Sequence, residues 1–208
     1  SSDLEIGTYS GFDFTENYEG QSAVNTITFQ GDDVNTVILT NTNTDAGANV
    51  FGAVTLVNVR DYVFKNLTIQ GKQNAISRGV VVRGNGSTNI LFEGCKITAN
   101  NTNTDANSSS AISRTTASPN GGTNYPDTIT FRNCTILGGN FGIHYVGSAT
   151  RKNHLTIEGC DITSCYRGIY TNYYTGNITG NHIKQVTCTN PQNFTGLHIN
   201  YLNGGYVS

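Results

Sequence analysis

The stretch "LTIEGCDIT" at residues 155–163 decides the fold, because the chain uses the same pattern twice before. It occurs as "ILFEGCKIT" from Ile90 and as "ITFRNCTIL" from Ile129. In each copy, apolar residues alternate with polar ones, as in a strand with one buried face. A Gly-Cys or Asn-Cys pair then interrupts the alternation. Glycine and asparagine adopt left-handed backbone conformations readily, so we expect a corner there, followed by another short strand.

This pattern is one half of a longer repeat. Taking the apolar residue before the corner as equivalent aligns five segments, at Phe64, Phe92, Phe131, Ile157 and Ile178. A second phrase interleaves with them, as "GVVVRG" from Gly79, "AISRTT" from Ala111, "GIHYVG" from Gly142, "GIYTNY" from Gly168 and "GLHINY" from Gly196, with "AVTLVN" from Ala53 as an earlier member. Such repeats bury their apolar residues only by stacking on one another. The sequence therefore predicts an all-β solenoid of about six to seven rungs with three short sheets.

The composition agrees with short strands and tight turns. The 208 residues include 27 Asn, 29 Thr and 24 Gly, and only 12% are charged. Threonine favours strands, and asparagine and glycine favour turns. The net charge of −2, with no basic run, argues against a nucleic-acid partner. No segment has the roughly 18 continuous apolar residues of a membrane-spanning helix.

The paired phrases, written "GIxV…S" and "NxTIxNCxI", resemble the right-handed parallel β-helix of the pectin-lyase-like superfamily, in its secreted bacterial type. The resemblance covers roughly residues 25–207. It implies that "GIHYVG" and its equivalents form the first sheet, "LTIEG" the second and "DIT" the third. Because the fold carries lyases, hydrolases, adhesins and phage tailspikes, the resemblance implies architecture more than activity.

The two ends of the chain lead to different expectations. Residues 1–24, with the rings of Tyr9, Phe12, Phe14 and Tyr18, are expected to cover the first rung as an N-terminal cap, leaving 25–208 as the solenoid. At the other end, "GLHINYLNGGYVS" begins a rung without an evident cap, and an uncovered solenoid end favours aggregation. We therefore expect a longer polypeptide or a capping partner at this end. The polar insertions at 100–110 and 115–127 are expected to be loops.

Five cysteines leave at least one thiol outside any intramolecular disulfide. Cys95, Cys134 and Cys160 are expected to form a structural ladder of free, buried thiols, because stacked strands hold their side chains too far apart for a disulfide. A metal site is disfavoured there, since a column of ligands cannot surround a tetrahedral ion. A bond between Cys165 and Cys188 is possible but is not determined by the sequence.

The first sheet supplies the candidate binding surface. If Ile143, Ile169 and Leu197 point inward, alternation sends their successors outward in one column. Two residues further along these strands, Val146 and two asparagines are also expected to face solvent. An arginine of the "GVVVRG" segment is expected to face solvent with them. Rings and amides at regular spacing suit stacking on sugars and hydrogen bonding to their hydroxyl groups; an ordinary solvated sheet face is the alternative. The candidate ligand-binding residues are Arg83, His144, Tyr170, Asn172, His198 and Asn200.

Catalysis has less support in the sequence. Lyases that resemble this fold use Lys or Arg as a base with calcium held by acidic residues, and its hydrolases use neighbouring Asp residues. The five clear first-sheet phrases contain neither Asp nor Glu, so we expect no catalytic residues, cofactor or metal. "GDD" at 31–33 and "NTD" at 43–45 and 103–105 are similar to polygalacturonase motifs, but in reversed order, and are interpreted as turns.

The leading hypothesis is a non-catalytic extracellular β-helix domain of a secreted or surface-exposed bacterial protein that binds glycans or another surface. One alternative is a polysaccharide lyase or glycoside hydrolase acting on acidic polysaccharide, with Arg83, Arg114 or His144 contributing. The other is a structural spacer that holds a neighbouring domain away from a cell or virion.

Overall fold

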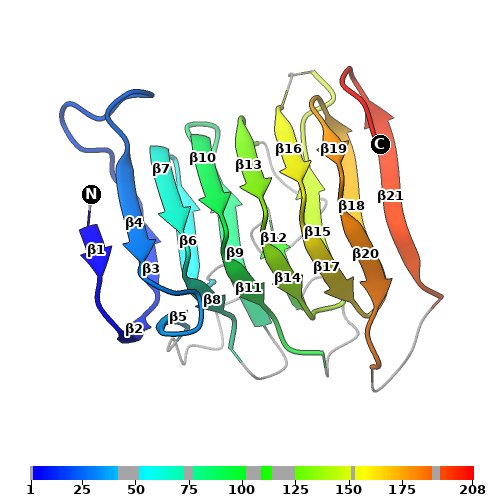
Figure 1. Cartoon of the computed structure of the whole chain (residues 1–208). Coiled ribbons are helices and arrows are strands. Elements are labelled where there is room, and N and C mark those ends of the chain that lie inside the picture. Colours follow the sequence, from blue (N-terminus) through cyan, green and yellow to red (C-terminus); the bar gives the residue numbers. More distant parts are fainter. Residues whose placement is uncertain are drawn as a thin grey trace.

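The computed structural model describes residues 2–41, 52–72, 77–101, 109–113, 125–150, 153–188 and 193–208. These residues form a right-handed parallel β-helix of three parallel sheets, each with seven strands (Figure 1). The described residues contain no helix. The fold predicted from the repeat is confirmed, because every strand pairs in parallel with its equivalents in the neighbouring rungs.

Each rung places one strand in each sheet, and we keep the names first, second and third sheet. The first sheet contains β3 (Phe12–Phe14), β6 (Val54–Val57), β9 (Ser77–Arg83), β12 (Ser109–Ser113), β15 (Phe141–Val146), β18 (Arg167–Tyr174) and β21 (Thr195–Leu202). The second contains β1 (Ser2–Leu4), β4 (Ile27–Gly31), β7 (Arg60–Lys65), β10 (Thr88–Glu93), β13 (Ile129–Arg132), β16 (Leu155–Glu158) and β19 (Ile178–Thr179). The third contains β2 (Gly7–Ser10), β5 (Val37–Thr40), β8 (Thr68–Gln70), β11 (Lys96–Thr98), β14 (Thr135–Leu137), β17 (Asp161–Ser164) and β20 (His182–Gln185).

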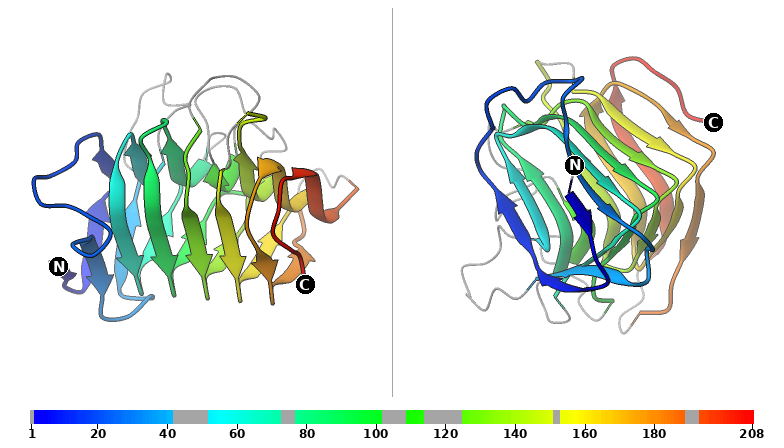
Figure 2. Two further views of the ribbon diagram at one scale, coloured as in Figure 1. Left: turned by 90° about the horizontal axis from the view of Figure 1, so that it is seen from above. Right: turned by 60° about the vertical axis from the view of Figure 1, so that its left-hand side comes forward.

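The N-terminal segment is part of the solenoid. Its strands β1, β2 and β3 pair with β4, β5 and β6, so residues 2–14 form the first rung, where a cap had been expected (Figure 2). The physical reason lies in the "FDF" of β3, whose alternation turns Phe12 and Phe14 inward onto Phe29, at ring-centroid distances of 5.5 and 5.3 Å. Since these rings fill the interior, the segment covers the next rung by continuing the same stack.

A file of aromatic rings fills the interior behind the second sheet. Phe64, Phe92 and Phe131 are in register and fully buried. Their rings stack with centroids 5.0 and 5.1 Å apart. Ile157 and Ile178 continue the file in the next two rungs. The register confirms the alignment of the five repeats, and offset stacking makes each rung stabilise its neighbours.

The corner after the second sheet has the geometry that the Gly-Cys and Asn-Cys pairs predict. The residue before the ladder position has a left-handed backbone in every rung from β7 onward, at Asn66, Gly94, Asn133, Gly159 and Gly180, with φ between 50° and 62°. A Cβ on Gly94 would lie 2.5 Å from Oδ1 of Asn66 in the rung below. Glycine at this position therefore avoids both the left-handed strain and a steric clash.

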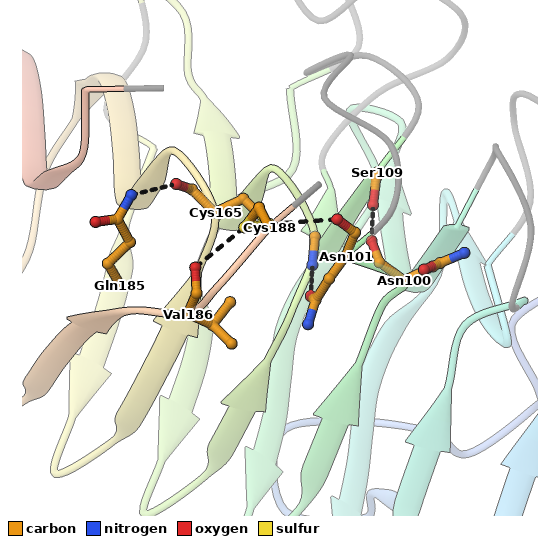
Figure 3. The surroundings of a disulfide bond; sticks show 8 residues. Asn100, Asn101, Ser109, Cys165, Gln185, Val186 and Cys188 are labelled. Carbon is orange, nitrogen blue, oxygen red and sulfur yellow. Dashed lines mark hydrogen bonds between the residues drawn. A yellow bond between two sulfur atoms is a disulfide. The ribbon is translucent and has the colours of Figure 1, made fainter. Parts of the chain in front are cut away.

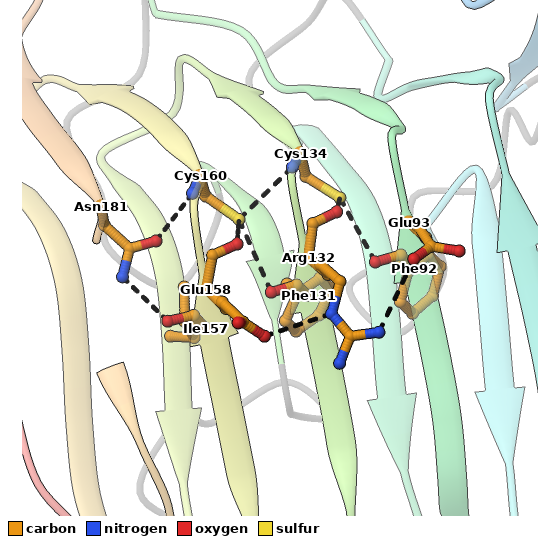
Figure 4. Close-up of polar contacts among 9 residues, drawn as sticks. All are labelled: Phe92, Glu93, Phe131, Arg132, Cys134, Ile157, Glu158, Cys160 and Asn181. Atoms are coloured by element: carbon orange, nitrogen blue, oxygen red, sulfur yellow. Dashed lines mark hydrogen bonds and ion pairs between the residues drawn. The ribbon is translucent and has the colours of Figure 1, made fainter. Parts of the chain in front are cut away.

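The ladder cysteines are buried free thiols (Figure 4). Each lies within hydrogen-bonding distance of a carbonyl oxygen in the preceding rung: Cys95 of Phe64, Cys134 of Phe92 and Cys160 of Phe131, at 3.4, 3.5 and 3.6 Å. Asn181 takes the ladder position in the next rung. Its Nδ2 donates to the carbonyl oxygen of Ile157 at 2.9 Å, and its Oδ1 accepts from the backbone N–H of Cys160 at 2.9 Å. The amide thus makes the same contacts as a cysteine.

The environment of the ladder raises the pKa of two of these thiols, those of Cys134 and Cys160. The hydrogen bond with Cys160 by itself lowers the pKa of Cys134. The contact with Cys95 and burial raise this pKa by more, so that it lies at about 12. The contact with Cys134, followed by burial, raises the pKa of Cys160 well above its ordinary value. Since the thiolate is the reactive species, the ladder is a packing feature.

The structure contains the disulfide that the sequence left open, between Cys165 and Cys188 (Figure 3). It extends a stack of corner residues. Asn101 accepts a hydrogen bond from the backbone N–H of Gly139 at 3.1 Å, and the carbonyl oxygen of Gly139 accepts one from the backbone N–H of Cys165. Gln185 then donates to the carbonyl oxygen of Cys165 at 3.2 Å. The disulfide therefore ties the segment after β20 to the corner between β17 and β18.

Candidate functional site

The candidate site lies on the outer face of the first sheet, over β15, β18 and β21. The register places Tyr170 directly opposite His144 on one side and His198 on the other. The ring centroids are 5.0 Å apart in both pairs, edge-to-face for His144 and tilted for His198. The structure therefore contains the expected column of three rings, held at the spacing of neighbouring strands.

The column is not equally accessible along its length. His144 was expected to face solvent, but it is only 4% exposed, and Val146 is 7% exposed. The ring of Phe141 stacks on His144 at 4.8 Å between centroids, and Tyr170 lies against its other side. Alternation turned His144 out of the core, as predicted, but contacts on the outer face then buried it. His144 can support Tyr170, and the accessible rings are those of Tyr170 and His198.

Two amides lie beside the column. Asn172 and Asn200 are paired in register and half-buried. Nδ2 of Asn200 lies 3.5 Å from the hydroxyl oxygen of Tyr170, to which it can donate. Within the described residues, Oδ1 of Asn172 has no hydrogen-bond partner. The sheet thus brings four predicted residues together as two rings and two amides on adjacent strands, as the sequence analysis expected.

Arg83 lies apart from this group. It is on β9, opposite Val57 of β6, and β12 separates its strand from β15. Burial lowers the pKa of the Arg83 guanidinium, and the charge of Asp13 partly opposes this shift. Asp13 lies in β3 of the same sheet and is exposed. Sequence reasoning missed this carboxylate because it assigned residues 1–24 to a cap; the alternating "FDF" was the signal for a strand.

An arginine within an aromatic cluster is a further feature that sequence reasoning missed. The guanidinium carbon of Arg167 lies 4.6 Å from the ring centroid of Tyr166, 4.9 Å from that of Tyr170 and 5.6 Å from that of Phe141. Nη2 donates to the hydroxyl of Tyr166 at 3.0 Å. Such cation–π contacts contribute about 0.5–1 kcal/mol each where solvent reaches them. They fix Tyr170 from a second side. The sequence signal was "YRGIY" at 166–170, with a ring on each side of the arginine.

A second aromatic pair follows the amides. Tyr173 and Tyr201, which we call the tyrosine stack, come directly after Asn172 and Asn200, and their rings stack with centroids 4.5 Å and planes 5° apart. Both residues have left-handed backbones, with φ of 52° and 55°. A bulky residue in this conformation costs about 1–3 kcal/mol, whereas a ring pair contributes about 0.5–1.5 kcal/mol. Since Tyr201 is 65% exposed, burial of its ring adds little to offset this cost.

Some predictions lie outside the described residues: Arg114, the "NTD" stretches at 43–45 and 103–105, and most of the two polar insertions. In the part of the chain that the structure does describe, no cluster of three or more His, Cys, Asp or Glu side chains is arranged to hold a metal ion. Over the same ranges, the structure has no helix that could span a membrane.

Comparisons with known proteins give little further information. No protein-family model matches this chain, and no curated protein matches it. Among solved structures, ORF18 of Geobacillus virus E2 is similar, with 14% sequence identity and a TM-score of 0.42. The match covers 99% of this chain and 52% of the viral chain, so this chain spans about half the length of that protein.

Proposed function

We propose that this chain is a non-catalytic glycan-binding β-helix domain whose ligand lies across β18 and β21 on the first sheet. The observation that carries this proposal is the set of two rings and two amides held in register on adjacent strands: Tyr170, His198, Asn172 and Asn200. Aromatic faces stack on the C–H faces of sugar rings, and amides hydrogen-bond to hydroxyl groups on either side of the ring.

The support for these side chains favours binding over a solvated sheet face. Tyr170 is held by His144 on one side, by His198 on the other and by the guanidinium of Arg167. A ring fixed before the ligand arrives loses little conformational freedom on binding, which increases affinity. A solvated face alone does not require an arginine inserted between three rings.

The proposal includes an extracellular location, on a secreted or surface-exposed bacterial protein of the pectin-lyase-like type. The Cys165–Cys188 disulfide supports this location, because such bonds persist in oxidising compartments and are rare in reducing ones. Membership of that superfamily rests on the paired repeat phrases and on the three-sheet solenoid.

A glycan array tests the proposal, with the wild-type chain compared against the double variant Y170A/H198A. The matched control is Y18A/H182A, which removes the same residue types from exposed positions away from the first sheet. We expect the first variant to lose at least about tenfold in affinity for the glycans that the wild type binds, since two contacts of this kind supply about 1.4 kcal/mol or more. The control should bind as the wild type does.

Two results contradict the proposal. If no glycan is bound, the function is wrong; if Y170A/H198A binds normally, the site is wrong. Incubating the same chain with pectate and alginate, and following unsaturated uronate ends and new reducing ends, tests the enzymatic alternative. Detection of either product would refute the non-catalytic proposal and support a polysaccharide lyase or glycoside hydrolase.

A further inference from the structure

Arg167 supplies the charge of the three strands that form the candidate site. Together β15, β18 and β21 contain one residue of the types Lys, Arg, Asp and Glu, and it is Arg167. Its strand, β18, pairs with β15 on one side and with β21 on the other. In the same register, β15 has Phe141 and β21 has Thr195. The solenoid therefore folds at this position without a charge in both neighbouring rungs, so the fold itself does not require the arginine.

Contacts from several sides hold the guanidinium in place. The backbone N–H groups of Tyr166 and Arg167 both donate to the carbonyl oxygen of Asn140, at 3.0 and 3.1 Å. Cys165, which precedes Tyr166, is tied by the disulfide. The guanidinium lies among three rings, and its Nη2 donates to the hydroxyl of Tyr166 at 3.0 Å. A cation that is positioned before the ligand arrives loses little conformational freedom on binding, which increases affinity.

The described part of the chain pairs this cation incompletely. An arginine side chain keeps its positive charge in proteins and carries five N–H donors. Within that part of the chain, Tyr166 is its one hydrogen-bond partner, and none of the ion pairs includes Arg167. Its Nε is buried without a partner. Charges that leave water are paired in proteins because desolvation is costly, and a neutral hydroxyl and ring faces offset only part of that cost. The half-buried guanidinium is therefore suited to bind an anion.

We propose that Arg167 determines the specificity of the candidate site by binding an anionic group, a carboxylate, sulfate or phosphate, on the sugar that contacts Tyr170. The guanidinium carbon lies 4.9 Å from the ring centroid of Tyr170, and that centroid lies 5.0 Å from the ring centroid of His198. One ligand can therefore contact both rings and the cation. Arginine donates to such anions through paired N–H groups, and these charge-assisted hydrogen bonds are stronger than neutral ones. The sugar rests on the proposed function, to which the preference for an anion is an addition.

Matched pairs of ligands test this inference by titration calorimetry. Each pair is an acidic oligosaccharide that binds on the array and its neutral form: the methyl ester of a carboxylate, or the desulfated or dephosphorylated sugar. Comparing the three kinds of pair shows which anion is bound. We expect the wild type to bind the acidic form at least about tenfold more tightly than the neutral form.

Variants of Arg167 should change this preference in a graded way. R167Q should bind both forms within about twofold of each other, because it removes the charge. R167K keeps a charge without the planar fork and should keep part of the preference. The matched control is R132Q, which removes an arginine from the second sheet and should keep the wild-type preference.

The ratio of the two affinities separates specificity from packing. If Arg167 only packs against the rings, R167Q weakens both forms alike and leaves the ratio unchanged, which overturns the inference and keeps the proposed function. A wild-type chain that binds neutral forms as tightly as acidic ones has the same consequence. If no glycan is bound, the proposed function and this inference are both wrong. Because a variant can misfold, the Nε–H resonance of Arg167 in the wild type gives an independent result: it should shift more with the acidic form, and equal shifts refute the inference.

Discussion

Breaking the Cys165–Cys188 disulfide should destabilise the rung that carries half of the candidate site. The two cysteines are 23 residues apart in sequence. The chain-entropy relation for a closed loop of that length gives a stabilisation of about 3 kcal/mol near room temperature. Because each rung of a solenoid contacts only its neighbours, this loss should remain local. We expect it in β20 and β21, which the tied segment connects.

Hydrogen exchange with and without a reducing agent measures this effect strand by strand. A loss of about 3 kcal/mol in the free energy of local opening corresponds to about a hundredfold faster exchange. The affected amides should be those of β20 and β21, while those of β7 and β10 should exchange at unchanged rates. The variant C165A/C188A should reproduce the effect without reductant. It should also bind glycan more weakly, since His198 and Asn200 lie on β21.

Two results would refute this reasoning. Equal protection of β20 and β21 in the oxidised and reduced protein would mean that packing alone holds the rung. A uniform loss of protection across all rungs would mean that the solenoid unfolds as one unit, in conflict with nearest-neighbour stability. The three free thiols are not substrates for the reductant, so they do not confuse the comparison.

Three further predictions concern the thiol ladder and a row of charged side chains on the second sheet, in which Glu93 forms ion pairs with Lys65 at 3.0 Å and with Arg132 at 3.6 Å. N181A should lose about 1–2 kcal/mol of stability in urea unfolding, because it removes two hydrogen bonds from a half-buried corner; N181C, which restores the ladder residue, should recover part of the loss, and equal stability of all three proteins would contradict the ladder. Lys65 and then Arg132 lower the pKa of Glu93, so its contribution is present above its ordinary pKa and disappears as the pH falls through the lowered value; the stability difference between wild type and E93Q, below about 1 kcal/mol for such exposed charges, should vanish between pH values of about 5 and 3, and a constant difference would exclude this origin. Alkylation at a pH of about 8 should label no thiol in the folded protein and three after denaturation without reductant, because all three free thiols are buried and the thiolate is the reactive species; fast labelling of the folded protein would show that the thiols are accessible. The three thiols are those of Cys95, Cys134 and Cys160.

The sequence predicted the solenoid well because its signal is repeated. A single "LTIEGCDIT" is an ambiguous strand and turn, but five aligned copies fix which residues face inward and which residue turns the corner. The stacked phenylalanines and the left-handed residues of the corner follow directly from that alignment. The repeat alignment did not include the first rung, because "GTYS" and "FDF" lack the corner pair. Their pairing partners also lie far along the chain.

The candidate site was predictable only in part. Alternation placed Tyr170 and His198 in one column, since facing direction along a strand has a period of two. Alternation could not show that Phe141 covers His144, or that Arg167 lies among three rings, because these contacts depend on side-chain rotamers and on neighbouring strands. The left-handed tyrosines were equally hidden: nothing in "TNYYTG" distinguishes a strained residue from an extended one.

The sequence by itself determined the periodic properties of this protein: the stacked rungs, the inward and outward faces, and the ladder of thiols. Those properties repeat, so each copy reinforces the others and local rules suffice to identify them. The tertiary structure decided the features that do not repeat along the solenoid. These are the accessibility of the outward side chains, the disulfide between Cys165 and Cys188, and the stacking of two tyrosines in a strained conformation. Such events depend on packing between particular side chains on neighbouring rungs, which a repeat pattern does not encode.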